Sequence, residues 1–536
     1  MPPTSPPATI PVELPPAPHS PLAAEPAVEQ RGHLDRLLVL GMSLIALAVR
    51  LFVERGLWLD EAISARQAHL PFLEMLTDLR FGDVHPPGHH SVLWATVRLL
   101  GDGELALRAP SIAAGVAVIP LLYLTGRLAY DQQAGLAAAA FGTVAPLMVW
   151  YSHEARAYAL FMFLALAAIY AQLVVLKRSR TWGWALYALA TVALLWTHYF
   201  ASIQVAVQLL AFVAVAWSRW RSGQPVLRPL LLPLAAVVLV IGAAMVPLAP
   251  FALDQYQANT GSGGGGGGRA DLPTQAGGDA AGLDDDPTVY ALGANLVWAI
   301  WGFHSDEVMT RIVGMWPLSM LLGLALLGRG RSLATNLLVA SVVSQIAMLF
   351  AVGFHVRIAF EVRQFGGAVP LLLLLIARFV TVVPRRRAYA MLASLTVVAT
   401  LVMGLVDQQV NQQNPRIHDV RGAVEEVERR ADDRDVLVYT PVFLADVVHY
   451  YGRDLPNLQA PGEPIPRDPG TRVFLLGGFL DEPRYATVVG DTLARLEEDH
   501  EVVDEFEHPQ IQVWVLERSV DEPRRRGAGS LRDGDP

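Results

Sequence analysis

The sequence contains no cysteine, which excludes disulfide bonds, thiolate metal ligands and cysteine nucleophiles. Charge is also scarce: charged residues are 17% of the 536 positions, against about 25% in soluble globular chains. No basic stripe interleaved with aromatic residues is present, so nothing in the sequence indicates a nucleic-acid partner. With 53% hydrophobic residues and a mean hydropathy of +0.36, the composition instead indicates an integral membrane protein.

The first residues also lack the pattern of a cleavable signal peptide, which needs a basic start and a short apolar core. Residues 1–33 are rich in proline and alanine and have too few large apolar side chains to fold. We therefore expect a disordered cytoplasmic N-terminus, followed by an uncleaved membrane anchor at residues 37–53.

Long apolar runs are abundant from residue 34 to residue 407. A helix needs about 20 apolar residues to cross a bilayer, and eleven runs approach that length. They are residues 37–53, 109–127, 134–151, 157–176, 182–199, 201–218, 229–251, 308–328, 333–352, 366–383 and 388–406. The sequence therefore predicts an α-helical polytopic membrane protein with about eleven transmembrane helices over 34–407.

The basic residues predict which ends of these spans face the cytoplasm. With a cytoplasmic N-terminus, the connectors on that side carry twelve Lys or Arg, and the short connectors on the other side carry three. This bias agrees with the positive-inside rule. It places loops 54–108 and 252–307 and the C-terminal part outside the cytoplasm. Counting the apolar stretch 91–100 as a span would invert this order, so we interpret it as a short helix at the membrane surface.

The outer loop 252–307 and the C-terminal part differ in composition from the spans. Loop 252–307 is glycine-rich and contains three aspartates at 284–286; we interpret it as a flexible spacer, with a lid as the alternative. Residues 415–518 predict a small extracytoplasmic α/β domain with a mostly parallel sheet, and residues 519–536 a disordered tail. Its helices are expected over 418–431, 442–452 and 483–498, and its strands over 435–441, over 472–479 and as a pair within 501–518.

Several polar side chains lie where outer loops meet the spans. Asp60 and Glu61 follow the first span; a carboxylate partly removed from water there suits proton abstraction, although two acids also favour the start of a helix. His85 precedes two prolines that should begin the next helix sharply, and it is either a ligand-binding side chain or a solvated one.

The later outer connectors supply more candidates. Charged groups at a membrane boundary are functional candidates by default, and arginine can bind a phosphate through two parallel hydrogen bonds. The alternatives are an internal ion pair, an aromatic belt at the interface and snorkelling arginines. The candidates are His153, Glu154, Arg156, His198, Tyr199, Arg357 and Arg363. A carboxylate base beside an arginine phosphate clamp suggests attack on a carbon that carries a lipid phosphate as leaving group.

Three stretches carry a family resemblance. They read LWLDEAISARQAH, then HPPGHHSVLWATVRLLGDGELALRAPS, then APLMVWYSHEARAYAL, and together they span about residues 57–170. In this order they resemble the polyprenol-phosphate-dependent GT-C glycosyltransferases, the bacterial relatives of protein O-mannosyltransferases and aminoarabinose transferases. The motifs are specific for this superfamily and do not identify the sugar.

The resemblance implies roles for the matched positions. Asp60 corresponds to the base on the acceptor hydroxyl, supported by Glu61, and Glu154 to the second acidic position. Arg156 and Arg363 become candidates for the donor phosphate, with His85, His198 and Tyr199 as further pocket members. Some members of the family bind a divalent ion such as Mg²⁺ or Mn²⁺, for which Asp60 and Glu154 would be the ligands here; the sequence does not decide this.

The resulting expectation is a glycosyltransferase of mannosyltransferase-like type. It would move a hexose or pentose from a polyprenyl-phosphate donor to an extracytoplasmic glycan, lipid or protein acceptor, with inversion at the anomeric carbon. The alternatives are a flippase of lipid-linked saccharides, a non-catalytic homologue in cell-envelope assembly, and a ligase that transfers a whole saccharide. Spans that are mostly free of charge argue against the flippase, and the presence of both Asp60 and Glu154 argues against the non-catalytic homologue.

Overall fold

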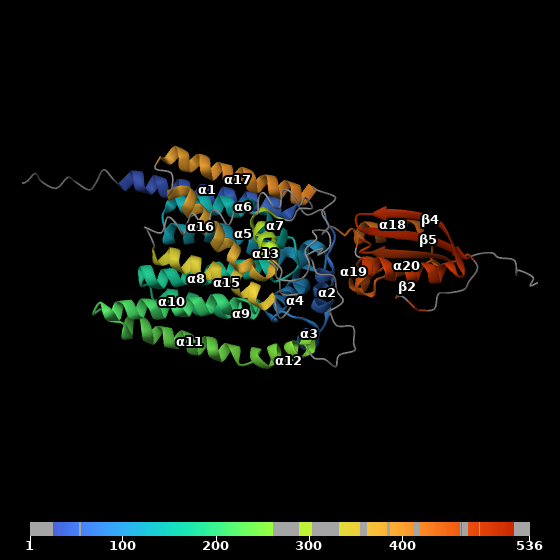
Figure 1. Ribbon diagram of the computed structural model, residues 1–536, viewed down its shortest axis with the longest axis horizontal. Coiled ribbons are helices and arrows are strands. Elements are labelled where there is room, and N and C mark those ends of the chain that lie inside the picture. Colours follow the sequence, from blue (N-terminus) through green and yellow to red (C-terminus); the bar gives the residue numbers. More distant parts are fainter. Residues whose placement is uncertain are drawn as a thin grey trace, which may run out of the picture.

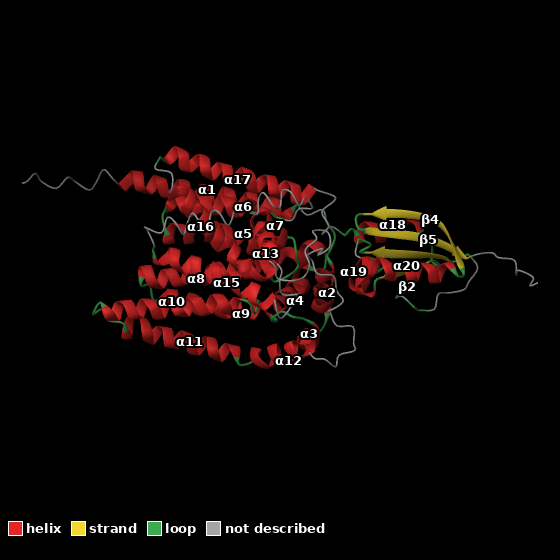
Figure 2. Ribbon diagram, in the orientation of Figure 1, coloured by secondary structure: helices red, strands yellow, loops and turns green. Residues whose placement is uncertain are grey.

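The structure is a computed structural model in which helices lie side by side along the long axis and a small sheet lies beyond one end (Figures 1 and 2). It describes residues 25–52, 55–260, 289–302, 332–353, 362–382, 386–410, 418–460, 462–463, 470–481 and 483–518. The first described helix, α1 (Glu25–Leu51), begins at the end of the molecule opposite the sheet (Figure 1).

The helical body is built mainly of long apolar helices. Six of the described helices are long and apolar enough to cross a membrane, or seven if one bent pair forms a single span. They and their shorter neighbours are α1 (Glu25–Leu51), α5 (Glu104–Ala129), α6 (Gln132–Val144), α7 (Pro146–Ser152), α8 (Tyr158–Arg178), α9 (Trp182–Thr197), α10 (Ala201–Arg221), η2 (Leu227–Leu231), α11 (Leu232–Met245), α12 (Leu248–Thr260), α13 (Val289–Trp301), α15 (Leu333–Gly353), η6 (Val362–Ala368), α16 (Val369–Val382) and α17 (Arg387–Val410).

The expected spans can be compared with these helices. Ten of the eleven overlap a described helix, and the run 308–328 lies outside the described residues. α9 and α16 are shorter than the other spanning candidates, so the count of eleven stays a prediction. The expected surface helix at 91–100 is the second part of α4 (Gly88–Leu100), which has 13 residues and is too short to cross a bilayer.

One expected span, 134–151, is broken in the structure into α6 and α7, which meet at 55°. Pro146 has no N–H to donate, and Ala145 before it is extended, as the residue before a proline prefers. The Arg50 side chain donates to the carbonyls of Gly142 and Thr143 at 3.3 and 3.2 Å, which satisfies backbone groups that the break leaves free. The bend sets the direction in which the chain leaves α7 toward residues 153–156.

Three short helices form a layer between the helical body and the sheet (Figure 1): α2 (Leu59–His69), α3 (Phe72–Gly82) and α4. α4 begins directly after Pro86 and Pro87, as expected, and it packs closely on α9. A Cβ added at Gly88 would lie 2.4 Å from the Trp196 carbonyl oxygen, so only glycine permits this approach.

The C-terminal unit, residues 418–518, contains a five-stranded sheet of order β2-β1-β3-β5-β4. Its strands are β1 (Val436–Thr440), β2 (Leu458–Gln459), β3 (Arg472–Gly478), β4 (His500–His508) and β5 (Ile511–Arg518), and its helices are α18 (Val420–Arg430), η7 (Val442–Leu444), α19 (Ala445–Tyr451) and α20 (Pro483–Glu497). The expectation of a mostly parallel sheet is wrong, because β1 is parallel to β2 and β3 whereas β5 is antiparallel to β3 and β4. Only two residues join β4 to β5, and a parallel pair needs a much longer crossover.

The apolar core of the C-terminal unit also contains residues of α2. Leu59 and Ala62 of α2 are buried in the same apolar cluster as Val424, Leu444 and Phe474. The layer helix α2 is therefore packed from one side by the C-terminal unit.

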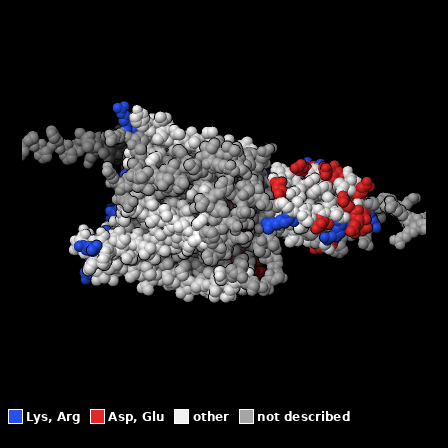
Figure 3. All heavy atoms as spheres, viewed as in Figure 1, with Lys and Arg blue, Asp and Glu red and all other residues white. Residues whose placement is uncertain are grey.

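Charge is segregated along the molecule. On the face in Figure 3, charged side chains cover the C-terminal unit and the opposite end of the helical body, and the described surface between them shows almost none. α8 ends with Lys177 and Arg178, and α10 with Arg219 and Arg221. This distribution is typical of a multi-pass membrane protein.

Candidate active site

Three segments far apart in the sequence bring one carboxylate and two guanidinium groups together. Asp60, in the first turn of α2, has its Oδ2 3.4 Å from Arg363 Nη1 in η6 and 3.7 Å from Arg156 Nη2 after α7. The Asp60 side chain is 16% exposed and that of Arg156 only 3%. The site therefore presents a partly accessible acid flanked by two cations.

Glu61, the neighbour of Asp60, lies in a different environment. Its carboxylate is fully buried and receives two hydrogen bonds from Arg108 at 2.8 and 3.0 Å. The backbone N–H groups of Trp58 and Ala155 donate to it as well, each at 2.9 Å. Burial alone would raise the pKa of Glu61, but the charge and hydrogen bonds of Arg108 outweigh it and bring the pKa below its usual value.

The Arg156 guanidinium is held by the side chains of Ser64, Asp83 and His85. It donates to Ser64 Oγ at 3.1 Å, and its Nη1 lies 3.7 Å from Asp83 Oδ2. His85 Nδ1 lies 3.0 Å from Asp83 Oδ1 and 3.1 Å from Arg156 Nη2. Burial and the positive charge of Arg156 lower the pKa of His85, which keeps this ring neutral at neutral pH.

The second acidic position, Glu154, is fully buried. Its Oε1 accepts a hydrogen bond from Trp150 Nε1 at 2.7 Å and lies 3.5 Å from Arg55 Nη2, while Oε2 has no partner among the described residues. The Arg55 guanidinium lies over the Trp150 ring, 4.0 Å from its centre. Burial, aided by the negative charges of Glu61 and Asp60, raises the pKa of Glu154.

An aromatic wall adjoins His85. The His198 ring stacks on Phe161 at 4.3 Å between ring centres and lies 5.5 Å from the His85 ring. The Tyr158 ring is 5.8 Å from that of His85. The buried His198 Nε2 and Tyr158 hydroxyl have no hydrogen-bond partner in the described part of the chain. Both are therefore available to a bound molecule.

The remaining sequence candidates lie farther from this centre. The Tyr199 hydroxyl donates to Gln255 Oε1 at 2.7 Å, and Gln255 in turn donates to the His85 carbonyl at 3.0 Å, so Tyr199 acts on the site through the backbone. His153 is buried near Arg55; burial first, then the neighbouring arginines, lower its pKa to about 3. Arg357 lies outside the described residues.

The described residues do not provide a metal site. No three His, Asp or Glu side chains among them gather in a way that could hold a metal ion. Asp60 faces two guanidinium groups, and Glu154 Oε1 is taken up by Trp150 and Arg55. We therefore derive no step through a metal.

The structure adds residues that were not singled out in the sequence. Asp83 lies two positions before His85, and Glu104 and Arg108 belong to the stretch GELALRAPS that carried part of the resemblance. Their position in that motif could have identified Glu104 and Arg108 as site residues from the sequence. Trp150 likewise belongs to the stretch APLMVWYSHEARAYAL, whereas Arg55 had no such signal, because it takes part only through contacts that the fold creates.

Comparisons with known proteins match part of the sequence and the overall fold. Residues 84–244 match the family model described as dolichyl-phosphate-mannose-protein mannosyltransferase. ArnT from Cupriavidus metallidurans, in a crystal structure bound to undecaprenyl phosphate, superposes with a TM-score of 0.51 at 14% identity, covering 92% of this chain and 98% of that one. The oligosaccharyltransferase AglB from the archaeon Archaeoglobus fulgidus, in complex with an inhibitory peptide and a dolichol-phosphate, gives 0.51 at 11% identity, covering 92% and 75%. No curated protein matches the sequence.

The match over residues 84–244 and the similar fold agree with the resemblance to the polyprenol-phosphate-dependent GT-C glycosyltransferases that the three sequence motifs carry. The described part of the chain contains several apolar helices of a length and composition that could cross a membrane.

Proposed function

We propose that the protein transfers a sugar from a polyprenyl-phosphate donor to an acceptor hydroxyl on the extracytoplasmic side of the membrane. The observation that carries this proposal is the meeting of Asp60 with Arg156 and Arg363 at the end of the helical body that faces the C-terminal unit. An acid beside two arginines suits a reaction in which a hydroxyl loses a proton and a phosphate leaves.

The proposed reaction is a single displacement. The acceptor oxygen forms a bond to the anomeric carbon while the bond from that carbon to the phosphate oxygen breaks, and the configuration inverts. The acceptor proton passes to Asp60, and the lipid phosphate leaves with the electron pair of the broken bond. Arg156 and Arg363 stabilise the negative charge that develops on the phosphate.

The contacts of Asp60 suggest an order of events. Arg363 and Arg156 lie 3.4 and 3.7 Å from Asp60. A donor phosphate that binds these two arginines competes with Asp60 for them and weakens their hold on its carboxylate. Asp60 then accepts a proton more readily, so the base becomes effective when the donor is in place.

The other two acids have distinct roles in this proposal. Glu61, with its oxygens occupied by Arg108 and backbone N–H groups, positions the start of α2 and does not move a proton. Glu154 is buried, and its Oε2 has no partner among the described residues; it donates or accepts a hydrogen bond to orient a sugar hydroxyl.

A second candidate is transfer of a whole oligosaccharide. The TM-score to AglB, an oligosaccharyltransferase, equals that to ArnT. The same site chemistry would serve both reactions, since each breaks a bond between an anomeric carbon and a phosphate. The size of the donor sugar that is transferred distinguishes them.

The test is sugar transfer in membranes that contain the full-length protein. Radiolabelled polyprenyl-phosphate donors with single sugars and with oligosaccharides are offered together with a cell-envelope extract as acceptor. Wild type is compared with Asp60→Asn and with the control Asp78→Asn. Asp78, on α3 in the same layer, contacts only Arg66 and Gln67 in the described structure and is not part of the site.

The expected result is transfer by wild type and by Asp78→Asn, and a loss of about 1,000-fold or more in Asp60→Asn at equal protein level. Equal activity of Asp60→Asn would remove Asp60 as the base. Absence of transfer from every donor would overturn the proposed function.

A further inference from the structure

The C-terminal unit contacts the segment that carries Asp60. Residues 55–58 lead into α2, and Gly56 in this segment is packed tightly: an added Cβ would lie 3.0 Å from Arg421 Cβ and 3.0 Å from the Tyr451 hydroxyl. The Tyr451 hydroxyl also accepts a hydrogen bond from the Leu57 backbone N–H at 2.5 Å. Both Arg421 and Tyr451 belong to the C-terminal unit.

A continuous polar network joins these contacts to the acids of α2. Glu104 accepts hydrogen bonds from Tyr451 at 2.8 Å and from Arg421 at 3.2 Å. Arg108, one helical turn along α5, lies 3.4 Å from Glu104 and forms the buried pair with Glu61. Arg108 also donates to the carbonyls of Arg55 and Gly56 at 3.2 and 2.9 Å. The network thus holds the backbone before α2 and the residue next to Asp60.

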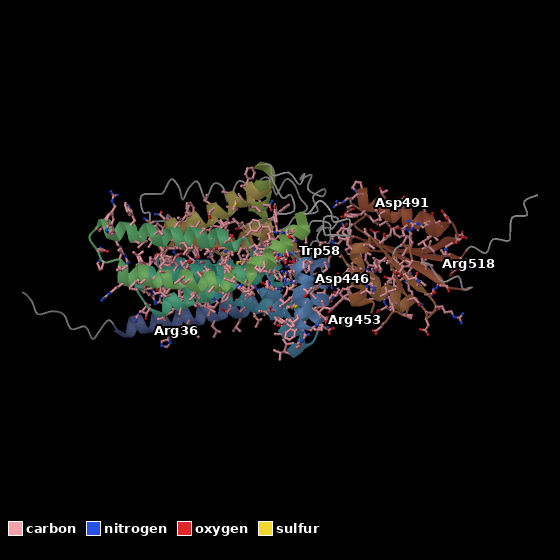
Figure 4. All side chains as sticks on the ribbon, turned by 90° about the horizontal axis from the view of Figure 1, so that it is seen from below. Arg36, Trp58, Asp446, Arg453, Asp491 and Arg518 are labelled. Atoms are coloured by element: carbon pink, nitrogen blue, oxygen red, sulfur yellow. The ribbon has the colours of Figure 1, made fainter. Side chains whose placement is uncertain are left out.

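Aromatic packing reinforces the same junction. The Trp58 ring, at the start of α2, lies 4.8 Å from His418 and 5.9 Å from Phe479 of the C-terminal unit, and those two rings stack at 4.2 Å. Phe479 has φ +63°, an unusual value for an aromatic residue, which its packing against neighbouring rings holds in place. Figure 4 shows Trp58, Asp446 and Arg453 at the junction, and Arg518 at the far end of the C-terminal unit.

We propose that Arg421 and Tyr451 of the C-terminal unit are positioning residues for catalysis: through Glu104, Arg108 and the backbone of 55–57 they fix the first turn of α2, and with it Asp60. This inference rests on the proposed function, in which Asp60 is the base. It assigns the C-terminal unit a part in the chemical step, in place of a role confined to binding the acceptor.

Two other contacts at the same junction provide a control for the experiment. Arg453 Nη1 lies 2.6 Å from Asp102 Oδ2, and Tyr450 donates to the Asp102 carbonyl at 2.7 Å. These contacts join the C-terminal unit to the turn before α5 and, since Asp102 Oδ2 also lies 3.2 Å from His69 Nε2, to the last residue of α2. No hydrogen bond or ion pair in the described structure links them to residues 55–61. Removing one of them should loosen the junction without displacing Asp60.

The experiment compares Tyr451→Phe, Arg421→Ala, Arg421→Lys and the control Arg453→Ala with wild type in the purified full-length protein. Two readouts are taken: hydrogen exchange of the peptide covering residues 55–62, which needs no substrate, and kcat and KM for the donor identified in the transfer assay. Thermal unfolding of each variant verifies that it is folded. Tyr451→Phe keeps the ring and removes only the hydroxyl, so it tests the network if Arg421→Ala fails to fold.

The expected result is faster exchange in 55–62 and a fall in kcat of about 10- to 100-fold for Tyr451→Phe and Arg421→Ala, since a small misplacement of a catalytic group has effects of this size. Donor KM should change less than about threefold, Arg421→Lys should recover part of kcat, and Arg453→Ala should resemble wild type.

Two results would overturn the positioning role. One is unchanged exchange in 55–62, which would mean that the network does not hold the segment. The other is faster exchange with unchanged kcat, including the case in which only the acceptor KM rises. If wild type transfers no sugar from any donor, the proposed function has failed and with it the catalytic role, while the exchange data still decide whether the network holds residues 55–62.

Discussion

At the residue scale, Asp60 and Glu61 show how adjacent carboxylates acquire different tasks. Consecutive helix residues do not face the same direction, so Asp60 points toward Arg156 and Arg363 while Glu61 points toward Arg108. The sequence showed the pair and its place after the first span. It could not divide the roles, because Arg108 is 47 positions away and its contact depends on the fold.

Glu61→Gln should destabilise the protein far more than Asp60→Asn does. Removing the Glu61 charge leaves Arg108 buried with a weaker partner, and breaking such a buried pair costs about 3–5 kcal/mol. Thermal unfolding of the purified variants in detergent measures this, and Asp60→Asn should unfold close to wild type. If Glu61→Gln were as stable as wild type and yet lost kcat, Glu61 would have a direct part in the reaction.

Arg363→Lys should weaken donor binding. Lysine keeps the charge but offers a point charge in place of the planar fork that matches a phosphate. We expect donor KM to rise about tenfold, which corresponds to about 1.4 kcal/mol, in steady-state transfer kinetics. Arg66→Lys is the control, because Arg66 pairs with Asp78 and Asp446 on the outer side of α2. An unchanged donor KM in Arg363→Lys would separate Arg363 from the phosphate.

At the element scale, the apolar runs predicted most helices of the described chain, because burial in lipid needs long uninterrupted apolar segments. They did not predict the break at Pro146, where apolar composition continues on both sides. The two-residue strand β2 was also missed, since it is too short to carry an alternating pattern. Most site residues were found because polar side chains stand out at the ends of apolar runs. Their pairing was beyond the sequence, as the contact of Asp60 with Arg363 joins residues 303 positions apart.

The close approach of α5 and α6 gives a prediction for the helical body. A Cβ at Gly135 would lie 2.6 Å from the Tyr123 carbonyl oxygen, and one at Gly126 would lie 2.7 Å from Gly135 Cα. Gly135→Ala should therefore force the helices apart and cost about 1–3 kcal/mol, seen as a lower unfolding temperature. Gly242→Ala in α11 is the control, because nothing lies within 4 Å of its added Cβ. Equal unfolding temperatures for both variants would show that the α5–α6 contact is not tight.

At the scale of the whole molecule, the candidate site lies in the layer between the apolar body and the C-terminal unit. This position explains why so many of its ionisable groups are buried: both parts cover α2 and the segments around it. Groups buried in this way titrate far from their ordinary range, and the stability of the protein must then depend on pH.

The protein should lose stability as pH falls below neutral. Burial is the largest cause of a lowered pKa at four histidines that lie outside the long helices of the body as the structure has them, where α9 ends at Thr197: His85, His89, His153 and His198. Because the unfolded chain binds protons at these rings near pH 6.5 and the folded chain does not, protonation favours unfolding as pH drops. A ring that stays unprotonated in the folded chain down to pH 5 contributes about 2 kcal/mol of lost stability between pH 7 and pH 5. Glu154 acts in the opposite direction through its raised pKa, but it is one group against four.

The measurement is the unfolding temperature of purified protein at pH 7 and pH 5, at one fixed heating rate, for wild type and two variants. His89→Leu removes one buried ring that has no hydrogen-bond partner among the described residues, so the fall in unfolding temperature between the two pH values should become smaller. His449→Asn, at an exposed position on α19, should leave that fall unchanged. An unfolding temperature that is the same at pH 7 and pH 5 in wild type would mean that these rings are solvated in the membrane protein, and that the layer around α2 is open to water.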